Sequence, residues 1–281
     1  MSESRGFGER LAGALAMHGG LCLGIDPHAH LLDVWGLPDT ADGAREFGLR
    51  AVEAAAGIVG VVKPQIAFYE RHGAGGYAGL ERVLASARDA GLLVIGDVKR
   101  GDMGTSFEAY AESWLTPGST LEVDAMTVNA FQGVGVLEPG FRLAEAHGKG
   151  LYVLVATSNP EARELQLATV PGGGTVSAAI LEGVQQRNAV PDGELGSFGA
   201  VVGATLDPAE FGLDLAAAPS VSILGPGFGA QGAALRDVRR IYGDAASRVL
   251  ASVSRDALAA GPDRLGARLV ELRDELERGL A

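Results

Sequence analysis

Eight apolar segments of strand length, separated mostly by stretches with helical spacing, are the feature that most constrains this chain. Near-continuous apolar runs are typical of parallel strands that are buried on both faces, and parallel strands need helical crossovers between them. The runs begin near residues 20, 58, 91, 123, 150, 198, 221 and 249. Eight such units predict a closed TIM-type (β/α)8 barrel, which needs roughly 250 residues. An open doubly wound sheet is the structural alternative, although eight units suit closure better.

We expect one barrel domain over residues 1–281, because no linker divides the chain. Residues 5–17 have apolar side chains at helical spacing and predict an N-terminal helix that caps the fold. Residues 159–174 contain two prolines and three consecutive glycines, which predict a long loop inserted after the fifth strand. Since loops of this length are often lids, a lid over a bound ligand is a hypothesis for this segment.

The composition limits the partners of the chain. A formal net charge of −12 argues against nucleic acid, which requires a basic surface, so an anionic ligand must be held by a few local cations. No apolar segment reaches the roughly 18 residues of a membrane span, and the N-terminus does not resemble a signal peptide. The single cysteine, Cys22, lies within an apolar run and is expected to be a core residue, with a cytoplasmic location as the default.

Polar side chains or a glycine-rich loop follow six of the eight runs, at the point where each strand is predicted to end. In a barrel the carboxyl ends of the strands meet at one mouth, which is where active sites are built. These side chains are therefore expected to converge. The six groups are Asp26, Lys63 with Gln65, Asp97 to Asp102, Thr157 with Ser158, the glycine-rich loop 225–232, and Arg255.

The sequence Asp97-Val98-Lys99-Arg100-Gly101-Asp102 places two carboxylates near one lysine. Asp97 and Lys99 lie on one face of the strand, and Asp102 follows in a loop from which it is able to fold back toward the same ammonium. For an isolated motif, a surface ion pair is the alternative. Two carboxylates favour the charged form of Lys99, which argues against a Schiff base and against a divalent metal between them. A positioned proton donor is the role that remains, with no metal expected.

The glycine-rich loop and Arg255 predict an anion site. The loop is able to present backbone N–H groups to an anion, and the loops after strands seven and eight are the usual phosphate site in such barrels. A salt bridge to a neighbouring helix is the alternative for Arg255. The polar residues Thr157, Ser158, Asn129 and Gln65 either cap strand ends or, together with Lys63, bind a heterocycle and sugar. His28 and His72 are interpreted as ordinary loop residues.

These residues resemble the orotidine 5′-phosphate decarboxylase family over nearly the whole chain. The resemblance rests on the Asp97–Asp102 motif, on Val62-Lys63-Pro64-Gln65, on Ala156-Thr157-Ser158-Asn159-Pro160, on residues 225–231 and on Ser254-Arg255. The Lys-Pro-Gln and Thr-Ser-Asn-Pro segments are similar to the bacterial subgroup with longer chains. One departure is Asn129-Ala130-Phe131, where that subgroup has Asn-Pro-Tyr, which puts the path of the loop after strand four in doubt.

The resemblance implies a decarboxylation of orotidine 5′-phosphate to UMP and CO2, in de novo pyrimidine biosynthesis, without metal or cofactor. Lys99 would protonate C6 of the pyrimidine, and Asp97 would lie close to the departing carboxylate. The resemblance also implies a homodimer, in which Asp102 reaches the neighbouring subunit's site, with Met103 and Ser106 near the same boundary. The implied substrate-binding residues are Asp26 and Lys63 for the ribose, Ser106, Ser158 for the pyrimidine amide, and Gly227, Gln231 and Arg255 for the phosphate.

Two alternatives stay open at the level of sequence. The first is a metal-dependent sugar-phosphate decarboxylase or aldolase of the same barrel superfamily. The second is a catalytically inactive nucleotide-binding barrel, against which the complete set of Asp97, Lys99 and Asp102 argues.

Overall fold

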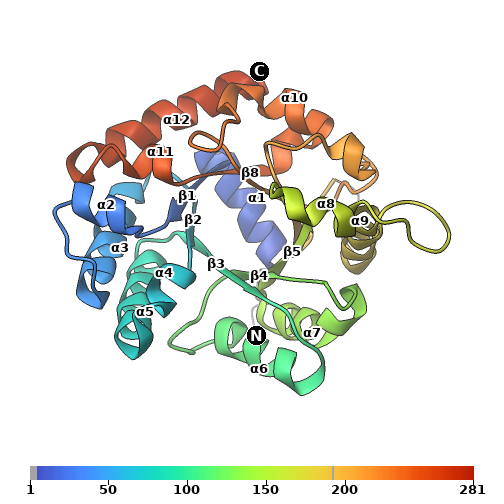
Figure 1. Cartoon of the computed structure of the whole chain (residues 1–281), viewed down its shortest axis with the longest axis horizontal. Coiled ribbons are helices and arrows are strands. Elements are labelled where there is room, and N and C mark those ends of the chain that lie inside the picture. The colour runs from blue at the N-terminus through green and yellow to red at the C-terminus, as the bar shows by residue number, and fades with distance from the viewer. Residues whose placement is uncertain (1–4, 192) are drawn as a thin grey trace.

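The computed structural model, which describes residues 5–191 and 193–281, contains a closed barrel of eight parallel strands. Each strand pairs with the next along the chain, and β8 pairs with β1, so the strand order is the chain order (Figure 1). The predicted (β/α)8 fold is confirmed. The strands are β1 Leu21–Ile25, β2 Val61–Pro64, β3 Leu93–Arg100, β4 Ala125–Val128, β5 Gly150–Ala156, β6 Phe198–Val202, β7 Ile223–Pro226 and β8 Val249–Val253.

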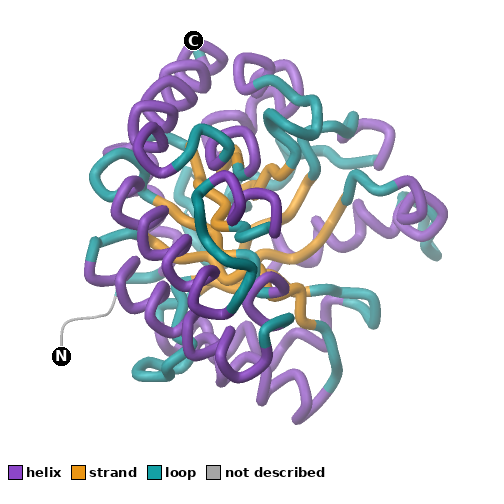
Figure 2. Tube along the Cα trace, turned by 60° about the vertical axis from the view of Figure 1, so that its left-hand side comes forward, coloured by secondary structure: helices purple, strands orange, loops and turns teal. Residues whose placement is uncertain are grey.

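Helices surround the strands on the outside of the barrel, as Figure 2 shows. The α-helices are α1 Phe7–His18, α2 Ala29–Val34, α3 Ala41–Ala55, α4 Ala67–Glu70, α5 Gly73–Asp89, α6 Gly104–Leu115, α7 Glu138–His147, α8 Arg163–Gln166, α9 Val176–Arg187, α10 Val238–Tyr242, α11 Arg255–Leu258 and α12 Leu265–Leu280. Short 3₁₀ helices lie at η1 Val134–Leu137, η2 Pro160–Ala162, η3 Pro208–Phe211, η4 Leu235–Asp237, η5 Gly243–Arg248 and η6 Pro262–Arg264. The segment 159–174, predicted as loop, thus contains η2 and α8.

Helix α1 packs against the inside of the barrel at the amino-terminal ends of the strands. Phe7 and Leu11 are fully buried against inward-facing residues of all eight strands, and Phe7 meets Tyr152 edge-on with 6.1 Å between ring centroids. Arg10 of the same helix pairs with Asp124 just before β4. The floor of the barrel is therefore filled by side chains, and the open mouth is at the opposite end.

Cys22 belongs to this floor cluster and is buried, so the expectation of a core residue is confirmed. Burial raises the pKa of its thiol to about 12. A thiol with such a pKa is not a nucleophile near neutral pH.

The pairing of β3 with β4 is irregular at the end nearest the predicted site. Gly96 pairs with Met126 and Arg100 pairs with Val128, so three residues of β3 lie opposite Thr127 alone. Within this bulge Lys99 has a φ of 46°, in the left-handed region that non-glycine residues rarely adopt. Bulges bend a strand and re-aim its side chains, and this one lies at the Asp97–Lys99 motif.

None of the helices within the described ranges combines the length and the apolar character that crossing a membrane would require.

Candidate active site

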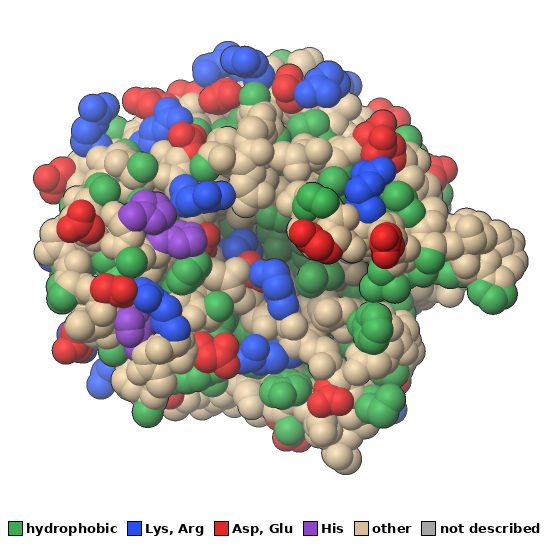
Figure 3. Space-filling model, in the orientation of Figure 1, with side chains coloured by type: hydrophobic (Ala, Val, Ile, Leu, Met, Phe, Trp, Pro, Cys, Tyr) green, Lys and Arg blue, Asp and Glu red, His purple; other side chains and the backbone are tan. Residues whose placement is uncertain are grey.

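A cavity of about 280 Å³ opens at the carboxyl ends of the strands. Figure 3 shows this hollow near the centre of one face, with lysine and arginine side chains around it. Its polar lining comes from strand ends and from the loops that follow them, for every strand except β6, which supplies the apolar Val201. The side chains that were predicted to converge and do line the cavity are Asp26, Lys63, Gln65, Asp97, Lys99, Thr157, Ser158, Gln231 and Arg255, with Gly227 of the glycine-rich loop. Asn159, which follows Ser158, also lines it.

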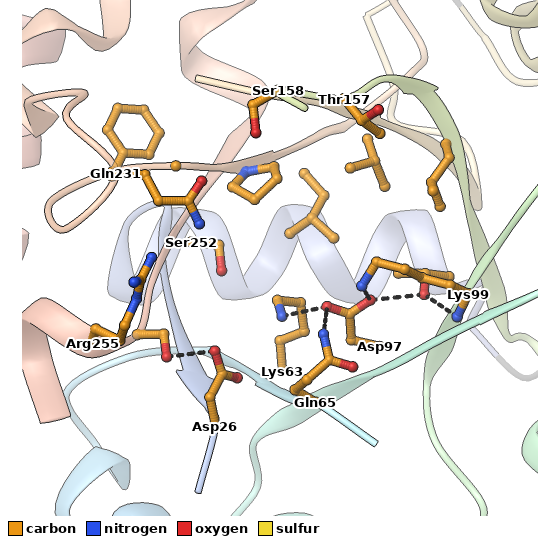
Figure 4. A pocket seen from close by; sticks show the side chains of 18 of the residues that line it. Asp26, Lys63, Gln65, Asp97, Lys99, Thr157, Ser158, Gln231, Ser252 and Arg255 are labelled. Carbon is orange, nitrogen blue, oxygen red and sulfur yellow. Dashed lines mark hydrogen bonds and ion pairs between the residues drawn. The ribbon is translucent and has the colours of Figure 1, made fainter. Parts of the chain in front are cut away.

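Asp97 is the centre of the hydrogen bonding at one end of the cavity (Figure 4). Its Oδ1 accepts from Lys99 Nζ at 2.6 Å and from Thr127 Oγ1 at 3.0 Å. Its Oδ2 accepts from Lys63 Nζ at 2.7 Å and from Gln65 Nε2 at 2.9 Å. Four donors from three strand ends thus fix the orientation of one carboxylate.

The two lysines at Asp97 differ in their exposure to solvent. The Lys63 side chain is 7% exposed and is paired with the buried Asp97, whereas the Lys99 side chain is 47% exposed at the cavity. Lys99 is therefore the ammonium that is placed to meet a ligand.

The charges of this cluster stabilise one another. Burial alone would raise the pKa of Asp97, but the ammonium groups of Lys63 and Lys99 outweigh it and hold that pKa far below its usual range. Burial likewise opposes the charge of Lys63, but the carboxylates of Asp97 and Asp26 outweigh it and raise the pKa of Lys63 above its ordinary value. Asp97 and Lys63 are therefore both charged at neutral pH.

Asp26 lies beside this cluster at the end of β1. Its Oδ2 accepts from Ser254 Oγ at 2.6 Å, while its buried Oδ1 has no partner within the described residues. The resemblance implied that Asp26 and Lys63 both bind the ribose; in this structure the ion-pair partner of Lys63 is Asp97. Asp26 Oδ1 remains available as an acceptor for a ligand hydroxyl.

The opposite end of the cavity carries Arg255 and Gln231, which Figure 4 shows away from the Asp97 cluster. In the described part of the chain Arg255 forms no ion pair, so the salt-bridge alternative is not observed. Gly227 and Gly229 have φ angles of 116° and 72°, and a Cβ at Gly229 would meet the Asp256 Cβ at 2.6 Å. This loop path therefore requires glycine. A guanidinium beside such a loop is suited to a phosphate group.

The end of β5 is tied to the segment 159–174. Gln166 of α8 accepts the backbone N–H of Thr157 at 3.0 Å and donates to Thr157 Oγ1 at 2.9 Å. Ser158, the next residue, lines the cavity together with Asn159. The root of the segment therefore lies at the cavity, while its tip between α8 and α9 projects away from the barrel in Figure 1.

Residues 19–268 match the orotidine 5′-phosphate decarboxylase / HUMPS family. The chain belongs to this family. A Nocardioides orotidine 5′-phosphate decarboxylase is 50% identical over 96% of this chain and 98% of its own length. That of Corynebacterium glutamicum strain ATCC 13032 is 45% identical over 98% of this chain and 96% of its own.

Solved structures agree with this membership in the orotidine 5′-phosphate decarboxylase family. A crystal structure from Streptomyces avermitilis superposes with a TM-score of 0.93 at 44% identity, covering 99% of this chain and 97% of that one. The OMP decarboxylase of Leishmania donovani superposes with a TM-score of 0.79 at 30% identity, covering 98% and 100%. The family resemblance that the motifs predicted is confirmed.

Two residues that the family resemblance assigns to the site do not line the cavity of this chain, namely Asp102 and Ser106. The sequence position of Asp102 would allow it to fold back toward Lys99, but it does not do so in this structure. Its Oδ1 instead accepts the neighbouring Met103 N–H at 2.8 Å. Ser106 lies exposed in the first turns of α6. The structure of the single chain therefore does not bring either residue to the cavity.

Two polar residues of the cavity were not singled out by their sequence, namely Thr127 and Ser252. Each carries the same signal as the predicted residues, a polar side chain near the carboxyl end of a barrel strand. Gln65, which was left between capping and binding, donates to Asp97, whereas Asn129 Oδ1 accepts the Phe131 N–H at 2.9 Å and caps its own loop. His28 and His72 lie outside the cavity lining.

Proposed function

We propose that this protein decarboxylates orotidine 5′-phosphate to UMP and CO2, the reaction named for its close relatives. The observation that supports this most is the pairing of Asp97 with Lys99 at one end of a cavity whose other end holds Arg255 and Gln231. Orotidine 5′-phosphate likewise has its carboxylate on the base at one end and its phosphate at the other. The cavity therefore separates a reactive end from a phosphate end.

The substrate fits this arrangement group by group. Arg255, Gln231 and the loop at Gly227 would bind the phosphate, and Ser158 at the end of β5 would bind the pyrimidine amide. Asp26 Oδ1, buried without a partner in the described chain, would accept a ribose hydroxyl. With the phosphate and base held in this way, C6 and its carboxylate would lie at Asp97 and Lys99.

The chemical step follows from the charges at the reactive end. Cleavage of the bond between C6 and the carboxyl carbon releases CO2 and leaves the electron pair on C6. The Lys99 ammonium donates a proton to C6, which gives UMP and a neutral amine. Solvent then protonates this amine again, because the Lys99 side chain is partly exposed. The atoms and charges balance without a metal or cofactor.

The energetic advantage lies in the transition state. Asp97 is charged and would lie beside the substrate carboxylate, so the repulsion between the two carboxylates disfavours the bound substrate. Lys99 would face the negative charge that grows on C6 during the reaction and would stabilise the transition state. Phosphate binding at Arg255, remote from the reacting bond, would supply free energy for this unfavourable placement. Remote binding energy is in this way converted into rate.

A homodimer completes the proposal, with Asp102 of each chain placed in the partner's site. The support comes from the surface around this loop, where large apolar side chains are exposed at Met103 (58%), Tyr110 (40%) and Phe131 (71%). Exposed apolar clusters of this kind favour a protein interface. We also propose a cytoplasmic location, in keeping with a single cysteine that is buried.

The decisive measurement is a spectrophotometric assay of the purified protein with orotidine 5′-phosphate. We expect UMP formation that EDTA leaves intact, and we expect Lys99→Ala to lower kcat by at least about 10³-fold while UMP still binds, because the proton donor is lost. Arg45→Ala is a control at a cation of similar exposure, since Arg45 is 42% exposed in its pair with Asp42 outside the cavity and its loss should leave kcat unchanged.

Two results would contradict the proposal. Activity on a sugar-acid phosphate that requires a divalent metal would support the metal-dependent alternative. A folded dimer that binds UMP but forms none from orotidine 5′-phosphate would support an inactive nucleotide-binding barrel.

A further inference from the structure

We propose that Thr127 is a positioning residue, whose hydroxyl fixes both the backbone of Lys99 and the carboxylate of Asp97. The inference rests on the proposed function, in which these two residues carry out the chemistry. Thr127 lies on β4, is 1% exposed, and makes both contacts through one oxygen atom.

The first contact replaces a missing strand pairing. Because three residues of β3 lie opposite Thr127 alone, the regular ladder does not continue through the bulge. The Lys99 backbone N–H donates instead to Thr127 Oγ1 at 2.9 Å. The side chain of Thr127 thus takes the place that a strand carbonyl would occupy.

The backbone held by this contact is an unusual one. Within residues 5–191 and 193–281, Lys99 is the one non-glycine residue with positive φ. Such conformations persist where the surroundings hold them, and they occur at functional sites. The Thr127 hydroxyl acts directly on the amide of the strained residue, so its removal should allow Lys99 to relax.

The second contact connects the same hydroxyl to the charge cluster. Thr127 Oγ1 donates to Asp97 Oδ1 at 3.0 Å, the oxygen that also accepts from Lys99 Nζ at 2.6 Å. A hydroxyl donates one hydrogen bond and accepts others, so both contacts are made together. Lys99 is therefore held at its backbone by Thr127 and at its ammonium by an oxygen that Thr127 orients.

Two variants separate this role from simple packing. Thr127→Val keeps the shape of the side chain but removes the hydroxyl, whereas Thr127→Ser keeps the hydroxyl and removes a methyl group. We expect the Val variant to lower kcat on orotidine 5′-phosphate by on the order of 10- to 100-fold, as for a lost hydrogen bond to a charged group, with UMP binding little changed. The Ser variant should recover most of the wild-type kcat.

Crystal structures of both variants provide a readout that does not depend on the reaction. We expect Lys99 to adopt a negative φ in the Val variant and to keep its positive φ in the Ser variant. An unchanged kcat or an unchanged Lys99 backbone in the Val variant would overturn the proposal, as would an equal loss of UMP binding in both variants. If the wild type were inactive on orotidine 5′-phosphate, the proposed function would fail, while the two Lys99 conformations would still decide the role of Thr127.

Discussion

At the scale of single residues, the buried pair of Lys63 and Asp97 connects the stability of the protein to its chemistry. The two side chains are 7% and 9% exposed, with 2.7 Å between Lys63 Nζ and Asp97 Oδ2. Removing one partner of such a pair leaves the other charge buried and unpaired, which is more costly than losing an exposed pair. The same carboxylate that positions Lys99 therefore also compensates a buried lysine.

We expect Asp97→Asn to lower the free energy of unfolding by about 3 kcal/mol at pH 7, measured by urea denaturation. The pKa of Asp97 is depressed in the folded protein, so its contribution is present above the ordinary value of 3.8 and is lost progressively as the pH falls below it. The difference between wild type and variant should thus be constant from about pH 7 to pH 5 and shrink below about pH 4.

The matched control for this prediction is Asp42→Asn, because the Asp42 side chain is 79% exposed in its pair with Arg45. Exposed ion pairs contribute little to the free energy of unfolding, so this variant should have the same free energy of unfolding as the wild type at every pH. The prediction would be refuted if the difference in free energy of unfolding between the wild type and Asp97→Asn stayed the same down to pH 3. It would also be refuted if Asp97→Asn were more stable than the wild type at pH 7.

At the scale of elements, the segment 159–174 has two parts that differ in their relation to the site. Its root is joined to Thr157 by the two hydrogen bonds of Gln166 and lies beside the cavity residues Ser158 and Asn159. Its tip contains three glycines with positive φ and projects away from the barrel. If the segment is a lid, the root is the part that responds to a ligand.

We expect UMP to slow tryptic cleavage after Arg163, at the root, by about tenfold or more when its concentration is about 100 times Kd, because the bound state opens less often. The Arg163 side chain is 46% exposed in its pair with Glu210. Cleavage after Arg278, exposed in α12, serves as the control and should not respond to UMP. Equal cleavage after Arg163 with and without UMP would count against a lid.

At the scale of the whole molecule, the barrel closes its floor but leaves one catalytic candidate outside its own cavity. Helix α1 fills the amino-terminal end, and the mouth collects residues from all eight strands. Asp102 is the exception, since it does not line the cavity and its Oδ1 accepts the Met103 N–H instead. If the proposed C2 dimer places one Asp102 at the partner's site, symmetry places the other in the same way.

Mixing two defective proteins tests this arrangement. We expect Lys99→Ala and Asp102→Ala to be inactive separately, and equal amounts allowed to exchange subunits to regain about a quarter of wild-type activity, since half the dimers are mixed and each has one intact site. The assay is UMP formation after subunit exchange. No recovery, with mixed dimers shown by mass spectrometry, would mean that Asp102 serves its own chain.

The sequence by itself determined the barrel and the side of the barrel that carries the site. Eight apolar runs with helical stretches between them suit one closed parallel sheet, and polar residues at the ends of the runs must then meet at one mouth. Local periodicity is sufficient for both conclusions, because it records which residues are buried and where each strand ends.

The tertiary structure decided which of those side chains touch. Lys63 and Asp97 are 34 residues apart, and their pairing depends on barrel closure and on the competition of donors for one carboxylate. The bulge that places Thr127 opposite Asp97 and Lys99 depends on the register of β3 against β4, which no local pattern encodes. Asp102 does not line the cavity of its own chain, and in the proposed dimer its place would depend on a contact between two chains, which no local pattern encodes either.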